Sequence, residues 1–158
     1  MFGAIVQSHR KTAGQGLLAG IMAAAFGIFM FAGAQSADLT ESPPAEPWAG
    51  VDSLVELPAF VPGAGELYID PDNAPFGPWL AYGSDGSLVE VLFMVPVSEM
   101  EQHGTWDDLA GDLLKEIGLT IDHVDITYNG GHPGMAEPHY HFRLAFVDHE
   151  TQEQLLSE

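Results

Sequence analysis

The sequence contains no cysteine and has very few basic residues. The lack of cysteine excludes disulfide bonds, a thiolate nucleophile and thiolate metal ligands. The 4 Lys and Arg residues stand against 23 Asp and Glu residues, and a surface this acidic repels the phosphates of nucleic acid. We therefore exclude nucleic acid as a partner, whereas the charge favours cations and basic protein surfaces.

Sequence motifs of common catalytic machinery are also missing. There is no Gly-x-Ser-x-Gly nucleophile elbow, and no Walker-type or dinucleotide-binding glycine pattern precedes an expected helix. Ser84 and Ser87 lie in an expected turn that offers them no base. We therefore predict that the protein is not an enzyme.

Charge is absent from Leu17 to Ala34, which follow the basic residues Arg10 and Lys11 and precede an acidic stretch. A helix of this length spans about 27 Å, close to the roughly 30 Å of a bilayer core. We predict that residues 1–35 form a single-pass anchor in the inner (cytoplasmic) membrane. The N-terminus would be cytoplasmic and the rest of the chain periplasmic. The alternative is a secretory signal peptide that is cleaved after Ala32-Gly33-Ala34.

Three residues near this segment are candidates for contact with partners. Gly16 and Gly20 match the small-xxx-small pattern that lets helices approach closely. Residues 36–50 are rich in proline and acidic residues and are predicted to be a linker. Trp48, within this linker, is interpreted either as a packing or membrane-interface anchor or as a contact to a partner.

Residues 51–158 are predicted to form one extracytoplasmic α+β domain, made mostly of antiparallel sheet with one main helix and a short C-terminal helix. Hydrophobic alternation and turn residues place the elements. The expected strands are 66–69, 79–82, 88–95, 122–128 and 139–147, and the expected helices lie within 98–118 and 148–156.

Alternation also assigns faces to the last two strands, because residues i and i+2 project to the same side. The predicted core row is Val124, Ile126 and Tyr128 together with Tyr140, Phe142, Leu144 and Phe146. The strand at 88–95 is apolar on both faces apart from Glu90, which predicts a central strand.

The opposite face of the same two strands carries the site candidates. His139, His141 and Arg143 lie on one strand, and Asp125 lies on the other. One allowed register sets Asp125 opposite His141. With His132 from the connecting loop, the residues His132, His139, His141 and Asp125 could bind zinc or copper. The alternative is a set of polar residues on the wet face of a sheet, bonded to nearby carboxylates.

Several motifs resemble a family of small exported bacterial domains of unknown function, typified by a thermophile protein under the control of an extracytoplasmic stress sigma factor. They are Val61-Pro-Gly-Ala-Gly-Glu-Leu-Tyr68, Gly77-Pro-Trp-Leu-Ala-Tyr82 and Pro138-His139-Tyr-His-Phe142. His132 and His139 match the family pattern, whereas Glu66, His141 and Arg143 stand where the family has His, Asp and His. The resemblance therefore implies the fold, and implies that any site of the family is altered here.

Three functions remain as hypotheses. The favoured one is a non-enzymatic accessory subunit of a larger bacterial membrane complex, such as a respiratory or photosynthetic one. Its helix would contact lipid and other subunits, and its acidic domain would brace the periplasmic partners. The first alternative is a periplasmic zinc- or copper-binding domain. The second is a metal-dependent hydrolase, in which Glu137 or Glu66 would act as the base toward a metal-bound water.

Overall fold

The computed structural model describes residues 38–157. The expected anchor, including Gly16 and Gly20, lies outside the described residues. From residue 38 to residue 157, no helix has both the length and the apolar character needed to cross a bilayer.

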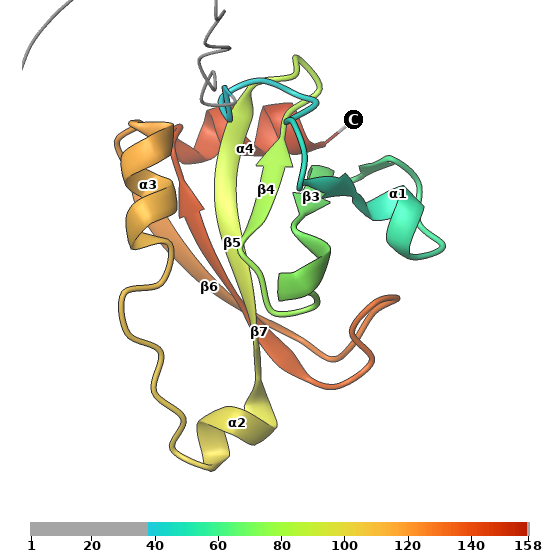
Figure 1. Ribbon diagram of the computed structural model, residues 1–158, viewed down its shortest axis with the longest axis vertical. Coiled ribbons are helices and arrows are strands. Elements are labelled where there is room, and N and C mark those ends of the chain that lie inside the picture. The colour runs from blue at the N-terminus through green and yellow to red at the C-terminus, as the bar shows by residue number, and fades with distance from the viewer. Residues whose placement is uncertain (1–37, 158) are drawn as a thin grey trace, which may run out of the picture. The chain divides into compact units, whose positions relative to one another are not determined.

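The described residues form an antiparallel sheet of seven strands with short helices (Figure 1), in agreement with the predicted α+β class. Six of the strands follow the order β1-β3-β4-β5-β7-β6, and β2 pairs with β3 off this path. The strand bounds are β1 Ala49–Gly50, β2 Phe60–Val61, β3 Gly65–Ile69, β4 Trp79–Tyr82, β5 Leu88–Pro96, β6 His123–Asn129 and β7 His139–Ala145.

Strand β5 is the centre of the sheet, between β4 and β7 (Figure 1). All nine of its residues are buried, which confirms the prediction of a central strand. Both faces are covered, so both sets of alternating side chains must be apolar or paired. Glu90 is the one charged residue of β5, and it is fully buried.

The helices are α1 Val51–Leu54, α2 Val97–Glu101, α3 Gly111–Ile117 and α4 His149–Leu156, with a 3-10 turn at Pro71–Asn73. The single main helix expected within 98–118 is wrong, because α2 and α3 are separate. His103, Asp108 and Ala110 have positive φ in or beside the connection, a conformation that no α-helix contains. The C-terminal helix is confirmed. It begins after Asp148, whose side chain accepts a hydrogen bond from Thr151 N at 3.0 Å.

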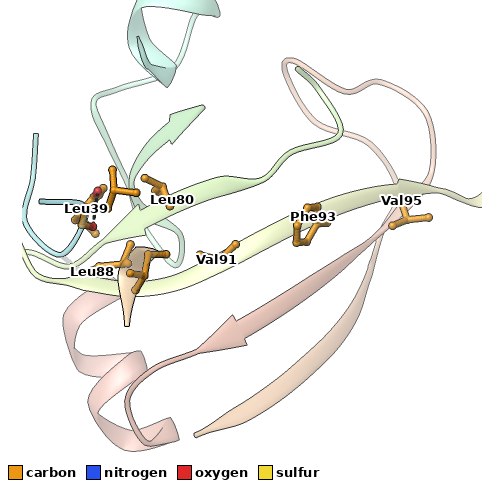
Figure 2. Close-up of a cluster of buried hydrophobic side chains, with 8 residues drawn as sticks. Leu39, Leu80, Leu88, Val91, Phe93 and Val95 are labelled. Carbon is orange, nitrogen blue, oxygen red and sulfur yellow. Dashed lines mark hydrogen bonds between the residues drawn. The ribbon is translucent and has the colours of Figure 1, made fainter. Parts of the chain in front are cut away.

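Each face of the sheet has its own hydrophobic core. One core contains Val91, Phe93 and Val95 of β5, and Figure 2 shows these side chains with Leu39, Leu80 and Leu88. The other core uses the alternate β5 residues Leu92 and Met94, together with Met135 from the β6–β7 loop. The period-2 alternation of one strand thus supplies both cores.

Residues from 38 onward, within the segment expected to be a linker, lie against the sheet. Leu39 is buried in the first core, and the Tyr82 hydroxyl donates to its carbonyl at 3.0 Å. Strand β1 pairs with β3. Trp48 is half-buried and packs against the first core, so this side chain makes contacts within its own domain.

The predicted core row on β6 is wrong. Val124, Ile126 and Tyr128 are 54%, 59% and 62% exposed. They do share a face with the β7 residues Phe142 and Leu144, which pack against the first core. However, β6 is the edge strand, and alternation shows which side a residue faces without showing how far the covering elements extend.

A matched pair of substitutions tests this assignment. Val91 and Val124 both lie opposite Leu144, on its two sides, but Val91 is fully buried and Val124 is exposed. We expect Val91→Ala to lower the free energy of unfolding by about 2 kcal/mol, because methyl groups are lost and a cavity is left. Val124→Ala should change it by less than about 0.5 kcal/mol. Urea unfolding measures both values, and equal losses would contradict the assignment.

Candidate metal centre

Strands β6 and β7 pair antiparallel around the glycine-rich loop, which is the pairing that the metal-site hypothesis assumed, and the residues His123, Asp125, Thr127, His139, His141 and Arg143 share one face. The register differs by two residues from the one considered above: Thr127 lies opposite His141, and Asp125 lies opposite Arg143. This correction moves Asp125 away from the loop. The structure places Asp125 in a group with His123 and His149 rather than with the loop histidine.

The three histidines His132, His139 and His141 converge at the loop end of this hairpin. The Nε2 atom of His139 lies 3.1 Å from Nε2 of His132 and 2.9 Å from Nε2 of His141. For comparison, two nitrogens bound to one tetrahedral zinc ion are about 3.3 Å apart, given Zn–N bonds of about 2.0–2.1 Å. The observed separations are within a few tenths of an ångström of that value.

The other ring nitrogens fix which nitrogen carries the proton. Nδ1 of His139 lies 2.7 Å from the Glu137 carbonyl oxygen, and Nδ1 of His132 lies 2.8 Å from the Pro133 carbonyl oxygen. A carbonyl oxygen only accepts, so each Nδ1 donates and each neutral ring has a lone pair on Nε2. Such backbone partners are also the usual means of orienting a metal-bound histidine.

This arrangement leaves two lone pairs facing each other at 3.1 Å. The contact between Nε2 of His132 and Nε2 of His139 is not a hydrogen bond when both rings are neutral, because neither atom carries a proton. At best, the Nε2–H tautomer of His141 donates to His139. A cation held among the three nitrogens would satisfy all of them together.

His141 is held in the neutral form that metal binding requires. Its burial, followed by the influence of His139, His132 and Arg143, lowers its pKa to about 4. At neutral pH the His141 ring is therefore not positively charged. His139 is fully buried, so the cluster reaches solvent through the two other histidines.

A tight turn positions His132 for this contact. Backbone hydrogen bonds of 2.9 and 3.0 Å join His132 to Met135 across Pro133 and Gly134. Proline followed by a glycine with positive φ, here +90°, is typical of a type II turn. Met135 is buried in the second core, so it anchors the turn to the sheet. Gly131 is equally restricted, because a Cβ there would collide with the Ala136 carbonyl oxygen.

Beside the histidines, the half-buried Arg143 forms an ion pair with the fully buried Glu90. Its Nε donates to Glu90 at 2.8 Å, and its Nη2 donates to the Gly63 carbonyl at 2.9 Å. The second carboxylate oxygen of Glu90 accepts from Gln152 of α4 at 2.6 Å. Burial raises the pKa of Glu90, against the opposing effect of Arg143. Sequence analysis did not assign this pair, although a single acid in an apolar central strand was a signal for a buried partner.

A second group of potential ligands is His123, Asp125 and His149. Nδ1 of His123 lies 3.0 Å from the Asp122 carboxylate, and its Nε2 lies 3.4 Å from Asp125. His149 is exposed, with its Nε2 3.7 Å from Glu153. These contacts are those of surface histidines with neighbouring carboxylates, and they account for the group without a metal ion.

The two carboxylates considered as catalytic bases lie elsewhere. The Glu137 side chain is exposed and accepts from Ser98 at 3.1 Å. The Glu66 side chain accepts from Ser42 at 2.5 Å, and Glu66 lies opposite Tyr82 on the first-core face. Neither placement supports a base next to the histidine cluster.

Comparisons with known proteins point to a relative without a described activity. No protein-family model matches the chain, and no curated protein matches it. Among solved structures, the chain is similar to the hypothetical protein TTHB210 from Thermus thermophilus, with 43% sequence identity and a TM-score of 0.59. The match covers 65% of this chain and 94% of that chain.

Proposed function

Because the chain belongs to the same family as the hypothetical protein TTHB210 of Thermus thermophilus, whose description gives no activity, we propose a function from the histidine geometry itself: the domain binds a zinc or copper ion through His132, His139 and His141. Imidazole nitrogens suit both metals. The observation that carries this proposal is the convergence of three Nε2 atoms, two of which have their lone pairs fixed by backbone carbonyls.

Three protein ligands leave the fourth position of a tetrahedral ion open, as in zinc sites that bind water or a further ligand. Neutral imidazoles add no charge, so the bound ion would keep its full +2 charge. The nearby acid Glu90 is already paired with Arg143. The favoured role is therefore metal binding with room for one further ligand. Among residues 38–157, neither Glu66 nor Glu137 is positioned as the base that the hydrolase hypothesis needs.

Zinc titration of single variants tests the proposal. We expect one zinc ion per chain, and His132→Ala, His139→Ala or His141→Ala should weaken binding by more than about 100-fold, because loss of a ligand costs more than loss of an outer partner. Isothermal titration calorimetry gives the affinity, and mass spectrometry of the metal gives the stoichiometry. Competition with copper then identifies the preferred ion.

His103→Asn is the matched control for these variants. His103 is exposed and outside the cluster, and asparagine tolerates its positive φ of +60°. It should bind zinc as the parent does. If the triple alanine variant keeps the parent affinity, the proposed site is wrong.

A pair of glycines tests whether the loop conformation positions His132. An added Cβ at Gly131 collides with the Ala136 carbonyl and also strains a φ of +120°, whereas at Gly130 it meets nothing within 4 Å. We expect Gly131→Ala to lower zinc affinity at least tenfold, because loss of a contact that orients a metal ligand typically costs about 10–100-fold in affinity. Gly130→Ala should lower the affinity less than about threefold, well below that range. The same calorimetric titration measures both, and equal affinities would show that the turn does not position the ligand.

The accessory-subunit function is our second proposal, and the exposed row Val124, Ile126 and Tyr128 favours it. An apolar row on an edge strand is typical of a surface that another protein covers. The chain carries 2 basic and 23 acidic residues after residue 37. A second copy would be repelled by this charge, so the partner we propose presents an apolar patch with a rim of Lys and Arg.

Isolation of the full chain from its native membranes tests this second proposal. We expect a stoichiometric partner to co-purify with the parent and to be lost with Ile126→Asp, because a charge would be buried at the contact. Leu119→Asp is the control, since Leu119 is also apolar and 41% exposed but lies outside β6. Intact-mass analysis identifies the proteins, and a parent chain without any stoichiometric partner would refute the proposal.

A further inference from the structure

A cavity of about 340 Å³ opens beside the histidine cluster. Two of the three proposed ligands, His132 and His141, line it, and Arg143 lines it as well. The lining also has an apolar part, which includes Leu57, Val61, Leu67, Leu92 and Met94. The volume is in the range of pockets that bind small molecules, roughly 300–1,000 Å³.

An apolar hollow adjoins the cavity, and His132 lines both. This smaller hollow, of about 70 Å³, shares Leu57, Leu67 and Met94 with the cavity and reaches Trp79. Leu67, Trp79 and Met94 belong to the second core, so these lining residues are packed against the interior of the domain. The cavity thus combines polar groups at the histidines and Arg143 with an apolar lining that adjoins the smaller hollow.

Charge decides what kind of group fits the polar end. A divalent ion on three neutral imidazoles brings a charge of +2 that no protein ligand balances. The buried carboxylate of Glu90 is engaged by Arg143 and Gln152. A ligand that completes the coordination in this partly desolvated place is therefore favoured when it is an anion.

Arg143 adds a second contact for such an anion. Its Nε and Nη2 donate to Glu90 and Gly63, and among residues 38–157 no acceptor is found for Nη1. His141 and Arg143 are two residues apart on β7 and project to the same face. A guanidinium and a metal ion on one wall of a cavity suit the two oxygens of a carboxylate.

We propose that this cavity binds a small aliphatic or aromatic monocarboxylate, with its carboxylate on the metal ion and its apolar body against Leu57, Val61 and Leu92. This inference rests on the proposed metal site. It assigns the ligand class by chemistry: one negative charge at one end and a compact apolar body at the other.

A ligand series on the full chain tests the proposal. First, zinc binding to the full chain is measured alone. Acetate, butyrate and hexanoate are then titrated into the zinc-loaded chain by calorimetry. Each added methylene should tighten binding by about fourfold, because it is buried against the apolar wall. Hexanol should bind at least tenfold more weakly than hexanoate, and removal of zinc should weaken hexanoate by a similar factor, since charged contacts contribute the difference.

Leu57→Gln is the variant that addresses the cavity alone. Leu57 is half-buried and is not a proposed metal ligand, so zinc affinity should stay the same while the gain from acetate to hexanoate shrinks. Arg143→Lys keeps a cation beside Glu90 but removes the paired N–H donors of the guanidinium. It should weaken the binding of acetate, butyrate and hexanoate by the same factor.

The outcomes separate the two proposals. Zinc binding without carboxylate binding refutes the ligand and leaves the metal site intact. Hexanoate that binds equally well without zinc, or no tighter than acetate, also refutes the ligand class. A chain that does not bind zinc refutes both.

Discussion

The pairing of β5 with β7 is the constraint on which both the cores and the site depend. Its register joins seven residue pairs and sets Leu92 opposite Arg143, Met94 opposite His141 and Pro96 opposite His139. A shift of one residue would move His139 and His141 to the first-core face and the core residues of β7 to the other face. The apolar side chains of β5 therefore hold the polar row of β7 in place, although they take no part in its chemistry.

Glu90 and Arg143 add charge to the same seam. Burying an ion pair costs desolvation energy, and a single unpaired partner would cost more. Here the carboxylate has two partners, since Gln152 of α4 supplies the second one. The pair consequently ties the last helix to the central strand and holds the Arg143 guanidinium beside the histidines. The ion pair therefore contributes more to the position of these side chains than to the free energy of unfolding.

Much of the sheet could be predicted from sequence, because alternation and turn residues are local signals. The central strand, the hairpin of β6 and β7 and the convergence of His139 with His141 on one face followed from spacing alone. The register of β6 against β7 could not be fixed from sequence, because registers that differ by two residues keep the same side chains on the same faces. The observed register sets Asp125 opposite Arg143 rather than opposite His141. The exposure of Ile126 could not be predicted either, since it depends on how far α3 and its loop cover the sheet. His132 was identified only as a loop residue. Its position comes from the buried anchor at Met135 and the backbone restriction at Gly131.

The three converging histidines all belong to one hairpin. Bringing them together requires closure of a short loop only, which costs little chain entropy, and pairing with β5 and the buried Met135 then hold the hairpin in place. The chemistry of the site can therefore change independently of the scaffold. Substitutions within one turn and one strand end would create, retune or abolish it, while both cores remain packed. A family with this architecture can keep a single fold and diversify at one corner, and similarity of overall sequence is then a poor guide to what each member holds there.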